Sequence, residues 1–181
     1  MLLLLISLLL PAQAQDDSQS QYAVCQSIES EKDLAHLETM RGITTQLLAT
    51  QLSELAVKIQ QNIERRKFGW TKREKRKYRH VLDTIIAIQD NIQKKARELG
   101  QDAKRFKQMS HIYQQSLARP DAKFRAELKT RCSEILAGTK RIPTETQKYL
   151  QAQKAILSSV NEELAQDRKG ITGKRRSSRR R

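Results

Sequence analysis

Cationic and aromatic side chains gather in residues 65–79, which we call the basic turn. Lysine and arginine side chains donate to phosphates and carboxylates, while aromatic rings stack on bases or enter a lipid interface. Its members are Arg65, Arg66, Lys67, Phe68, Trp70, Lys72, Arg73, Lys75, Arg76, Lys77 and Arg79. We predict that the basic turn binds an acidic protein surface or client protein, a nucleic acid, an anionic lipid or an anionic glycan.

An alternative reading assigns the same residues to structure. Phe68 and Trp70 would pack over the turn, and the charges would only solvate it. The turn carries nine basic residues, which is more than solvation requires and favours binding. Trp70 is the only tryptophan, and we expect it to lie beyond the reach of any core.

A second basic segment lies in residues 170–181, which we predict to be a disordered tail. Its cations are Lys174, Arg175, Arg176, Arg179, Arg180 and Arg181. Each such residue near an anionic surface adds about 1 kcal/mol of attraction without shape specificity. The formal net charge of the chain is +15, which also indicates acidic partners.

Catalysis has little support in the sequence. The three histidines, His36, His80 and His111, form no H-E-x-x-H pair, and the chain has no phosphate-binding glycine loop or nucleophile elbow. We therefore expect no enzyme, no cofactor and no metal site. Three carboxylates, Glu162, Glu163 and Asp167, are interpreted as exposed counter-charges to nearby cations.

The first residues predict export. Residues 2–10 are apolar but too short to span a bilayer, and Ala12-Gln13-Ala14 has the small-x-small pattern that signal peptidase reads. We assign residues 1–14 to a signal peptide and 15–20 to a flexible mature N-terminus, with a buried N-terminal helix as the alternative. The protein is expected in the periplasm or outside the cell.

The two cysteines agree with export. Cys25 and Cys132 lie on the apolar stripes of their predicted helices, so both thiols are expected to point toward the core. In an oxidising compartment an isolated pair is normally joined. We predict a disulfide, with two buried free thiols as the alternative.

Apolar residues repeated every seven positions predict the fold. The repeat is formed by Tyr78, Ile85, Ile92, Leu99, Phe106 and Tyr113. A spacing of seven buries one seam of a helix against a partner helix. We expect an all-α fold: a long antiparallel, coiled-coil-like hairpin of helices at residues 21–66 and 72–118. Gly69 would end the first helix in a left-handed conformation, and the capping box Thr71–Glu74 would start the second.

Two shorter helices should complete a three- to four-helix bundle spanning residues 21–169. One is expected at residues 120–137, ended by Gly138, and the other after Pro143. Both would pack on the base of the hairpin, which the Cys25–Cys132 bond would clamp, leaving the basic turn on a two-helix arm. Apolar residues beside the main stripes predict a homo-oligomer: Leu48, Ile86, Ile88, Met109 and Ile112.

These features favour an exported helical adaptor, assembly or chaperone-like protein. In a bacterium it would be a periplasmic component of an envelope or secretion assembly. One alternative is an extracytoplasmic protein that binds nucleic acid or an anionic polymer, for example in DNA transfer, with steep salt dependence. A second alternative is a secreted helical signalling protein, which would require four helices of comparable length.

Overall fold

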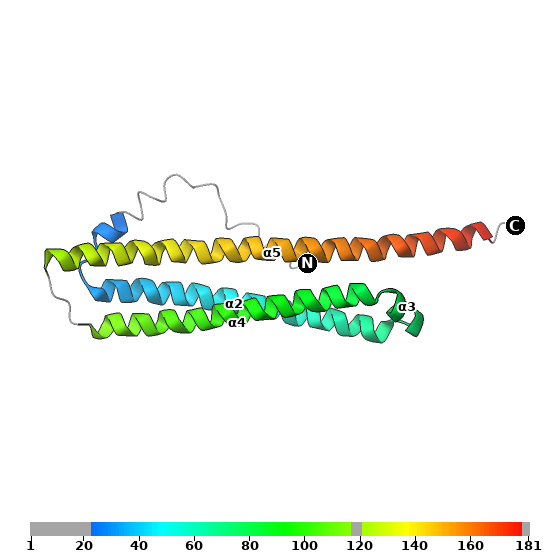
Figure 1. Cartoon of the computed structure of the whole chain (residues 1–181), viewed down its shortest axis with the longest axis horizontal. Coiled ribbons are helices and arrows are strands. Elements are labelled where there is room, and N and C mark those ends of the chain that lie inside the picture. Colours follow the sequence, from blue (N-terminus) through cyan, green and yellow to red (C-terminus); the bar gives the residue numbers. More distant parts are fainter. Residues whose placement is uncertain (1–22, 117–120, 179–181) are drawn as a thin grey trace, which may run out of the picture. The chain divides into compact units, whose positions relative to one another are not determined.

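The computed structural model describes residues 23–116 and 121–178, with side chains up to residue 167. Within these residues the chain is helical and contains no strand. The main helices are α2 (Glu31–Gly69), α3 (Lys72–Lys77), α4 (Arg79–Gln115) and α5 (Ala122–Ser178). Figure 1 shows α3 linking α2 to α4, which run antiparallel and pack on each other. The all-α helical hairpin is therefore confirmed. In the described part of the chain, no helix has the length and apolar character needed to cross a membrane.

The chain divides into two units, and each takes a segment of α2, α4 and α5. Unit 1 contains described residues 23–41, 106–116 and 121–139, and unit 2 contains 42–105 and 140–178. Each unit has its own apolar cluster. The basic turn belongs entirely to unit 2.

The cluster of unit 1 is built around the predicted disulfide. Cys25 and Cys132 are bonded, with Cα atoms 5.6 Å apart, and pack with Leu34, Tyr113 and Leu128. The prediction of a disulfide is confirmed. The bond closes a loop with a sequence separation of 107. In the chain-entropy model a loop of this length stabilises the folded state by about 4–5 kcal/mol.

Helix α2 begins at Glu31, so the predicted continuous helix from residue 21 is wrong. Residues 23–26 form a helical turn, and the chain then leaves the helix before Glu31. One Asp33 carboxylate oxygen accepts the backbone N–H groups of Ser30 at 3.0 Å and Glu29 at 3.2 Å, and the Ser30 hydroxyl at 2.9 Å. These bonds satisfy N–H groups that a new helix start leaves open, and they compete with continuous helix.

Gly138 lies inside α5, so the predicted helix end at this position is also wrong. A Cβ atom at Gly138 would lie 2.8 Å from Nη1 of Arg41. The Arg41 guanidinium lies 3.9 Å from the centre of the Phe106 ring, and its Nε donates to Glu38 at 2.9 Å. The missing side chain at Gly138 thus makes room for a cation that pairs with a buried carboxylate.

The cluster of unit 2 confirms the predicted repeat. Ile85, Ile92 and Leu99 of α4 are at most 3% exposed and pack with residues of α2 such as Leu52 and Ile63. The apolar seam therefore faces a partner helix, as expected for a hairpin.

A single helix replaces the two shorter helices that we expected. α5 continues through Pro143, and its later residues Tyr149, Leu157 and Leu164 pack on the cluster of unit 2. A proline in a helix interior costs about 3 kcal/mol. The packing of these side chains opposes this cost. Leu164 is buried, which is worth about 1.5–3 kcal/mol when burial is complete, and Tyr149 and Leu157 are partly buried. The predicted two-helix arm is wrong for the same reason, because Leu164 belongs to the cluster that contains Trp70.

Several predictions concern the ends of the chain. α5 passes Gly170 and Gly173 and ends at Ser178, where we expected a disordered tail. The signal peptide at residues 1–14 and the flexible segment at 15–20 lie outside the described residues. The side chains of the basic tail also lie outside the described part of the chain. The signal peptide, the flexible segment and the binding role of the tail therefore stay predictions.

Candidate functional site

The basic turn is shaped by a capping box. The Thr71 hydroxyl accepts the backbone N–H of Glu74 at 3.2 Å, and the Glu74 carboxylate accepts the N–H of Thr71 at 2.9 Å. The predicted capping box is confirmed. Gly69 does not have a positive φ, so the predicted left-handed end is wrong. The predicted second helix is interrupted at Tyr78, between α3 and α4, where φ is −104° and ψ is 24°.

Trp70 is buried in the cluster of unit 2, and only 8% of it is exposed. Its ring centroid lies 5.4 Å from that of Tyr78, and the Arg66 guanidinium lies 6.0 Å from the indole centre. The expectation that no core reaches Trp70 is wrong, because α5 covers this part of the hairpin. Trp70 thus holds the turn together, as the structural alternative proposed.

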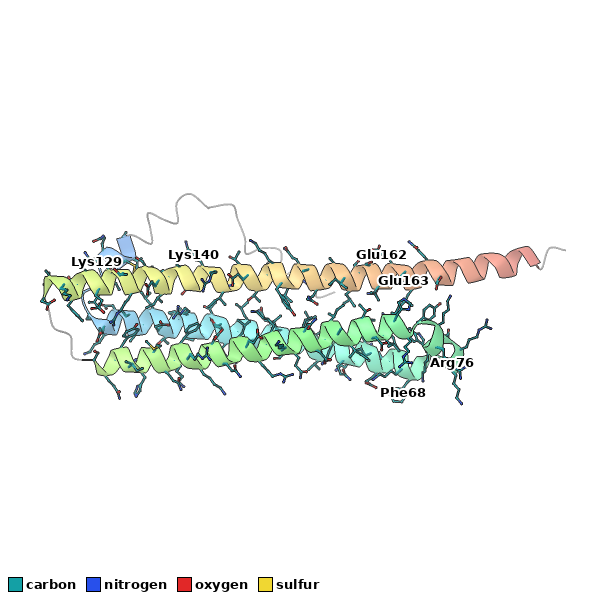
Figure 2. All side chains as sticks on the ribbon, viewed as in Figure 1. Phe68, Arg76, Lys129, Lys140, Glu162 and Glu163 are labelled. Carbon is teal, nitrogen blue, oxygen red and sulfur yellow. A yellow bond between two sulfur atoms is a disulfide. The ribbon has the colours of Figure 1, made fainter. Side chains whose placement is uncertain are left out.

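Phe68 behaves in the opposite way. It is 85% exposed, the largest exposed fraction among the exposed large apolar residues in the described part of the chain. Figure 2 labels Phe68 near the end of α2 and Arg76 on α3, at the same turn. Of the two aromatic residues singled out in the sequence, only Phe68 is available to a partner.

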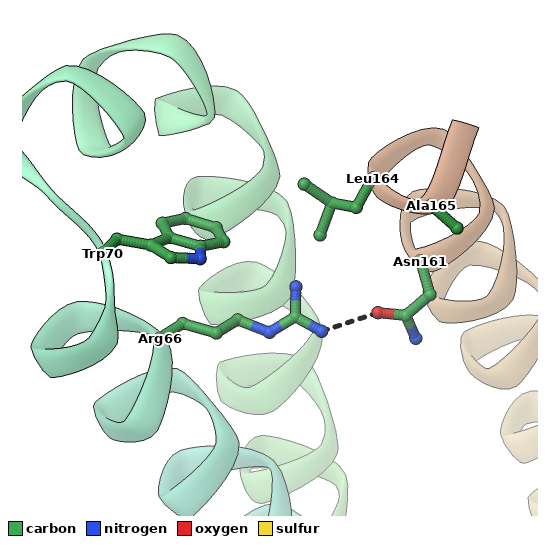
Figure 3. A pocket seen from close by; sticks show the side chains of 5 residues that line it. All are labelled: Arg66, Trp70, Asn161, Leu164 and Ala165. Atoms are coloured by element: carbon green, nitrogen blue, oxygen red, sulfur yellow. Dashed lines mark hydrogen bonds between the residues drawn. The ribbon is translucent and has the colours of Figure 1, made fainter. Parts of the chain in front are cut away.

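A hollow of about 480 Å³ opens beside the buried tryptophan. Figure 3 shows Arg66 between Trp70 and Asn161, with Leu164 and Ala165 completing the lining. Nη2 of Arg66 donates to Oδ1 of Asn161 at 2.7 Å. The hollow therefore combines an apolar wall with hydrogen-bonded polar groups, and both sides of it come from unit 2.

Some cations of the turn are neutralised within unit 2. Lys77 pairs with Asp167 at 2.8 Å, and Lys67 pairs with Glu64 at 3.2 Å. The hydrogen bond to Asp167 raises the pKa of Lys77 above its ordinary value, with a smaller contribution from Tyr78. His80 contacts Glu163 at 2.8 Å. The contacts of Lys77 and His80 join α5 to the turn and to the start of α4.

Five cations of the turn remain exposed and form no ion pair within the described residues. They are Arg65, Lys72, Arg73, Lys75 and Arg76. They belong to the end of α2 and to the short helix α3, at the same turn as the exposed Phe68. The turn therefore presents exposed positive charges and one exposed apolar ring, a composition that suits an anionic partner.

Sequence reasoning missed the part of α5 that completes the site. Asn161 and Leu164 contact the turn or line its hollow. Asp167 pairs with Lys77 of the turn, and Glu163 contacts His80 just after it. The spacing of Glu163 and Asp167 by four residues puts both carboxylates on one helical face. That acidic face was a signal that α5 lies beside a basic segment.

The residues expected to mediate self-association are divided between core and surface. Ile88 is 3% exposed, and Leu48 and Ile86 are partly buried against the cluster of unit 2. Met109 and Ile112 in unit 1 are 37% and 56% exposed. The prediction of a homo-oligomer now depends on these two residues.

Searches for similar proteins found no matching family model, no similar curated protein and no similar solved structure. Within the described part of the chain, no three histidine, cysteine, aspartate or glutamate residues are grouped so that they could hold a metal ion. The basic turn is therefore the feature of the described residues that indicates a function.

Proposed function

We propose that this protein is an exported helical adaptor, assembly or chaperone-like protein that binds acidic partners through its basic turn. The observation that carries the proposal is the group of five exposed cations without an ion pair in the described part of the chain. The turn that presents them is held in place by buried Trp70 and by the Thr71–Glu74 capping box.

The stability of the fold does not account for these cations. Lys72 lies three residues from Lys75 and four from Arg76, so like charges are neighbours on one helical face. Each such pair destabilises a helix by about 0.2–0.5 kcal/mol. Lys72 and Arg73 in the first turn of α3 also oppose its dipole, whereas Lys75 and Arg76 in the last turn favour it. The exposed charges of Lys72 and Arg73 are therefore better explained by binding than by folding.

The disulfide supports export. Cys25 and Cys132 form a bond that persists in oxidising compartments and is rare in the cytosol. Together with the predicted signal peptide, this favours the periplasm or the extracellular space. In a bacterium the acidic partner would then be a component or client of an envelope or secretion assembly.

The proposal is tested by neutralising the turn. The triple variant Arg73→Gln, Lys75→Gln, Arg76→Gln removes three exposed cations of the turn. The control variant Lys94→Gln, Arg97→Gln, Lys104→Gln removes three exposed cations from α4. Both variants lose three positive charges. A difference between them therefore shows that binding depends on the turn and not only on the net charge of the chain. The measurement is the salt concentration that elutes each protein from immobilised heparin and from immobilised polyglutamate.

We expect the turn variant to elute at clearly lower salt than the control variant on both supports. Equal shifts for the two variants would mean that the net charge of the chain, and not the turn, attracts the partner. Circular dichroism of each variant should show unchanged helix content, because all six side chains are exposed.

A second candidate is a protein that binds nucleic acid or another anionic polymer outside the cytoplasm. The exposed ring of Phe68 among cations favours it, because bases stack on such rings. Its affinity would fall steeply with salt, by a slope of about −0.7 per neutralised phosphate on single strands. The signalling alternative has less support, since α5 is one helix of 57 residues and not two of comparable length.

A further inference from the structure

Phe68 has no structural task in the described part of unit 2. It is 85% exposed, although it lies in the last turn of α2, close in sequence to residues that are buried in the cluster of unit 2. Trp70, two residues later, fills that role. Because Trp70 already fills the core at this turn, the exposed Phe68 ring is available to contact an apolar part of a partner.

Exposed cations precede and follow this ring in the sequence. Arg65 precedes it in α2, and Lys72, Arg73, Lys75 and Arg76 follow it in α3. Figure 2 shows that the labelled Phe68 and Arg76 lie at the same turn of the chain. Long basic side chains extend their charged ends toward phosphates while their stems cover apolar surface. One apolar ring surrounded by such side chains is the composition of a membrane-interface anchor.

The exposed aromatic content favours lipid over nucleic acid. Proteins that hold single strands present several rings on which successive bases stack. Here Trp70 and Tyr78 are only 8% and 5% exposed, so Phe68 is the one accessible ring among the aromatic residues of the turn. A single ring can stack on only one base and offers no platform for successive bases, whereas insertion at a lipid interface needs only one ring.

We propose that the basic turn docks on an anionic lipid bilayer, with Phe68 inserted at the headgroup level and the surrounding cations on lipid phosphates. The inference rests on the proposed function and names the class of its acidic partner. Each cation near the surface strengthens binding about fivefold. Insertion of the ring adds about tenfold or more.

The test uses the purified, oxidised protein and vesicles of two compositions. One contains phosphatidylglycerol mixed with phosphatidylcholine, and the other contains phosphatidylcholine alone. The variants are Phe68→Ala, Phe68→Leu and the matched control Val57→Ala, which removes another exposed apolar side chain of α2. Vesicle co-sedimentation gives the affinity, and circular dichroism checks the fold.

We expect the wild type to bind the phosphatidylglycerol vesicles at least tenfold more tightly than the neutral ones. Phe68→Ala should weaken that binding about tenfold, Phe68→Leu should restore most of it, and Val57→Ala should leave it unchanged. Equal binding by the wild type and Phe68→Ala would overturn insertion of the ring.

Two further outcomes separate this inference from the proposed function. Retention on heparin through the turn cations, without binding to either vesicle, would overturn the lipid inference and leave the proposed function standing. Tighter binding to single-stranded oligothymidine than to vesicles, lost in Phe68→Ala, would overturn it in favour of nucleic acid. Binding to neither heparin nor vesicles would overturn both proposals.

Discussion

Arg66 in α2 donates a hydrogen bond of 2.7 Å to Asn161 in α5, although the two residues are 95 positions apart. The same guanidinium lies 6.0 Å from the centre of the Trp70 ring. α5 therefore closes the hairpin turn from one side, which explains why Trp70 is buried while Phe68 is exposed. Stability and binding are assigned to different aromatic residues of the same turn.

The first prediction separates these two roles. Trp70→Ala should lower the free energy of unfolding by about 3–5 kcal/mol, because it removes a large buried side chain and leaves a cavity. Phe68→Ala should change it by less than about 0.5 kcal/mol, since that ring is exposed. Urea unfolding followed by circular dichroism measures both. A similar loss in the two variants would contradict the assignment.

The second prediction concerns the disulfide. Reduction of Cys25–Cys132, or the double variant Cys25→Ala, Cys132→Ala, should lower the free energy of unfolding by about 4–5 kcal/mol in the chain-entropy model. Guanidinium unfolding with and without a reducing agent measures the difference. Reductant should have no effect on the double variant, which is the control. An unchanged midpoint for the reduced wild type would contradict the prediction.

The third prediction is a loss of stability in acid. Burial by itself raises the pKa of Asp33, but hydrogen bonds from Ser30 and from the backbone of Glu29 outweigh it and hold the pKa below 3.8. A lowered carboxyl pKa stabilises the folded state above pH 3.8, and this contribution is lost as the pH falls through the folded value. The loss is measured as a decrease in the free energy of unfolding between neutral pH and about pH 3.

Asp33→Asn is the matched variant for this prediction. It should cost about 0.5–2 kcal/mol near neutral pH, because it weakens the cap of α2. Its unfolding free energy should fall less steeply in acid than that of the wild type. Asp83→Asn, at an exposed pair 4.0 Å long with Arg79, should change the neutral-pH value by less than about 1 kcal/mol. Parallel acid profiles for the wild type and Asp33→Asn would refute the role of Asp33.

The fourth prediction compares two helical glycines. Gly100→Ala should stabilise the protein by up to about 1 kcal/mol, because nothing lies within 4 Å of the added Cβ atom. Gly138→Ala should stabilise the protein less than Gly100→Ala, because the added atom displaces the end of the Arg41 side chain, which pairs with a carboxylate, Glu38, that is only 2% exposed. Thermal unfolding of the two variants measures the difference. An equal gain in both would show that Arg41 moves without cost.

The fifth prediction concerns self-association. Met109 and Ile112 lie one helical turn apart on α4 and are exposed. Ile112→Lys should abolish concentration-dependent association in sedimentation velocity, while Gln101→Lys, the same added charge about three turns earlier, should not. A wild type that stays strictly monomeric at high concentration would remove the predicted oligomer.

Local signals in the sequence predicted much of the fold. The seven-residue repeat identified the buried face of α4, where Ile85 and Ile92 are at most 1% exposed. Thr71 and Glu74 form the capping box that their spacing indicated. The two cysteines form the bond that an isolated pair in an exported protein favours. The repeat and the capping box are recognised from spacing within one helix, and the disulfide is recognised because the chain has only two cysteines.

The errors in α5 and at Trp70 share one physical cause, which is packing between distant segments. Pro143 and Gly138 are helix breakers in isolation, yet α5 continues because Tyr149 and Leu164 bury apolar surface and Arg41 fills the space over Gly138. Trp70 was expected in solvent because α5 was not placed beside it. The site was located by its charges, but sequence alone could not distinguish the buried ring from the exposed one.

The disulfide also has a consequence for the order of biosynthesis. Cys25 leaves the ribosome long before Cys132, which lies 107 residues later. The earlier thiol must stay reduced, or be exchanged out of wrong pairings, until the first part of α5 has been made and delivered. Oxidation is therefore a late event in maturation, and trapping the free thiol of Cys25 would report how far a nascent molecule has progressed.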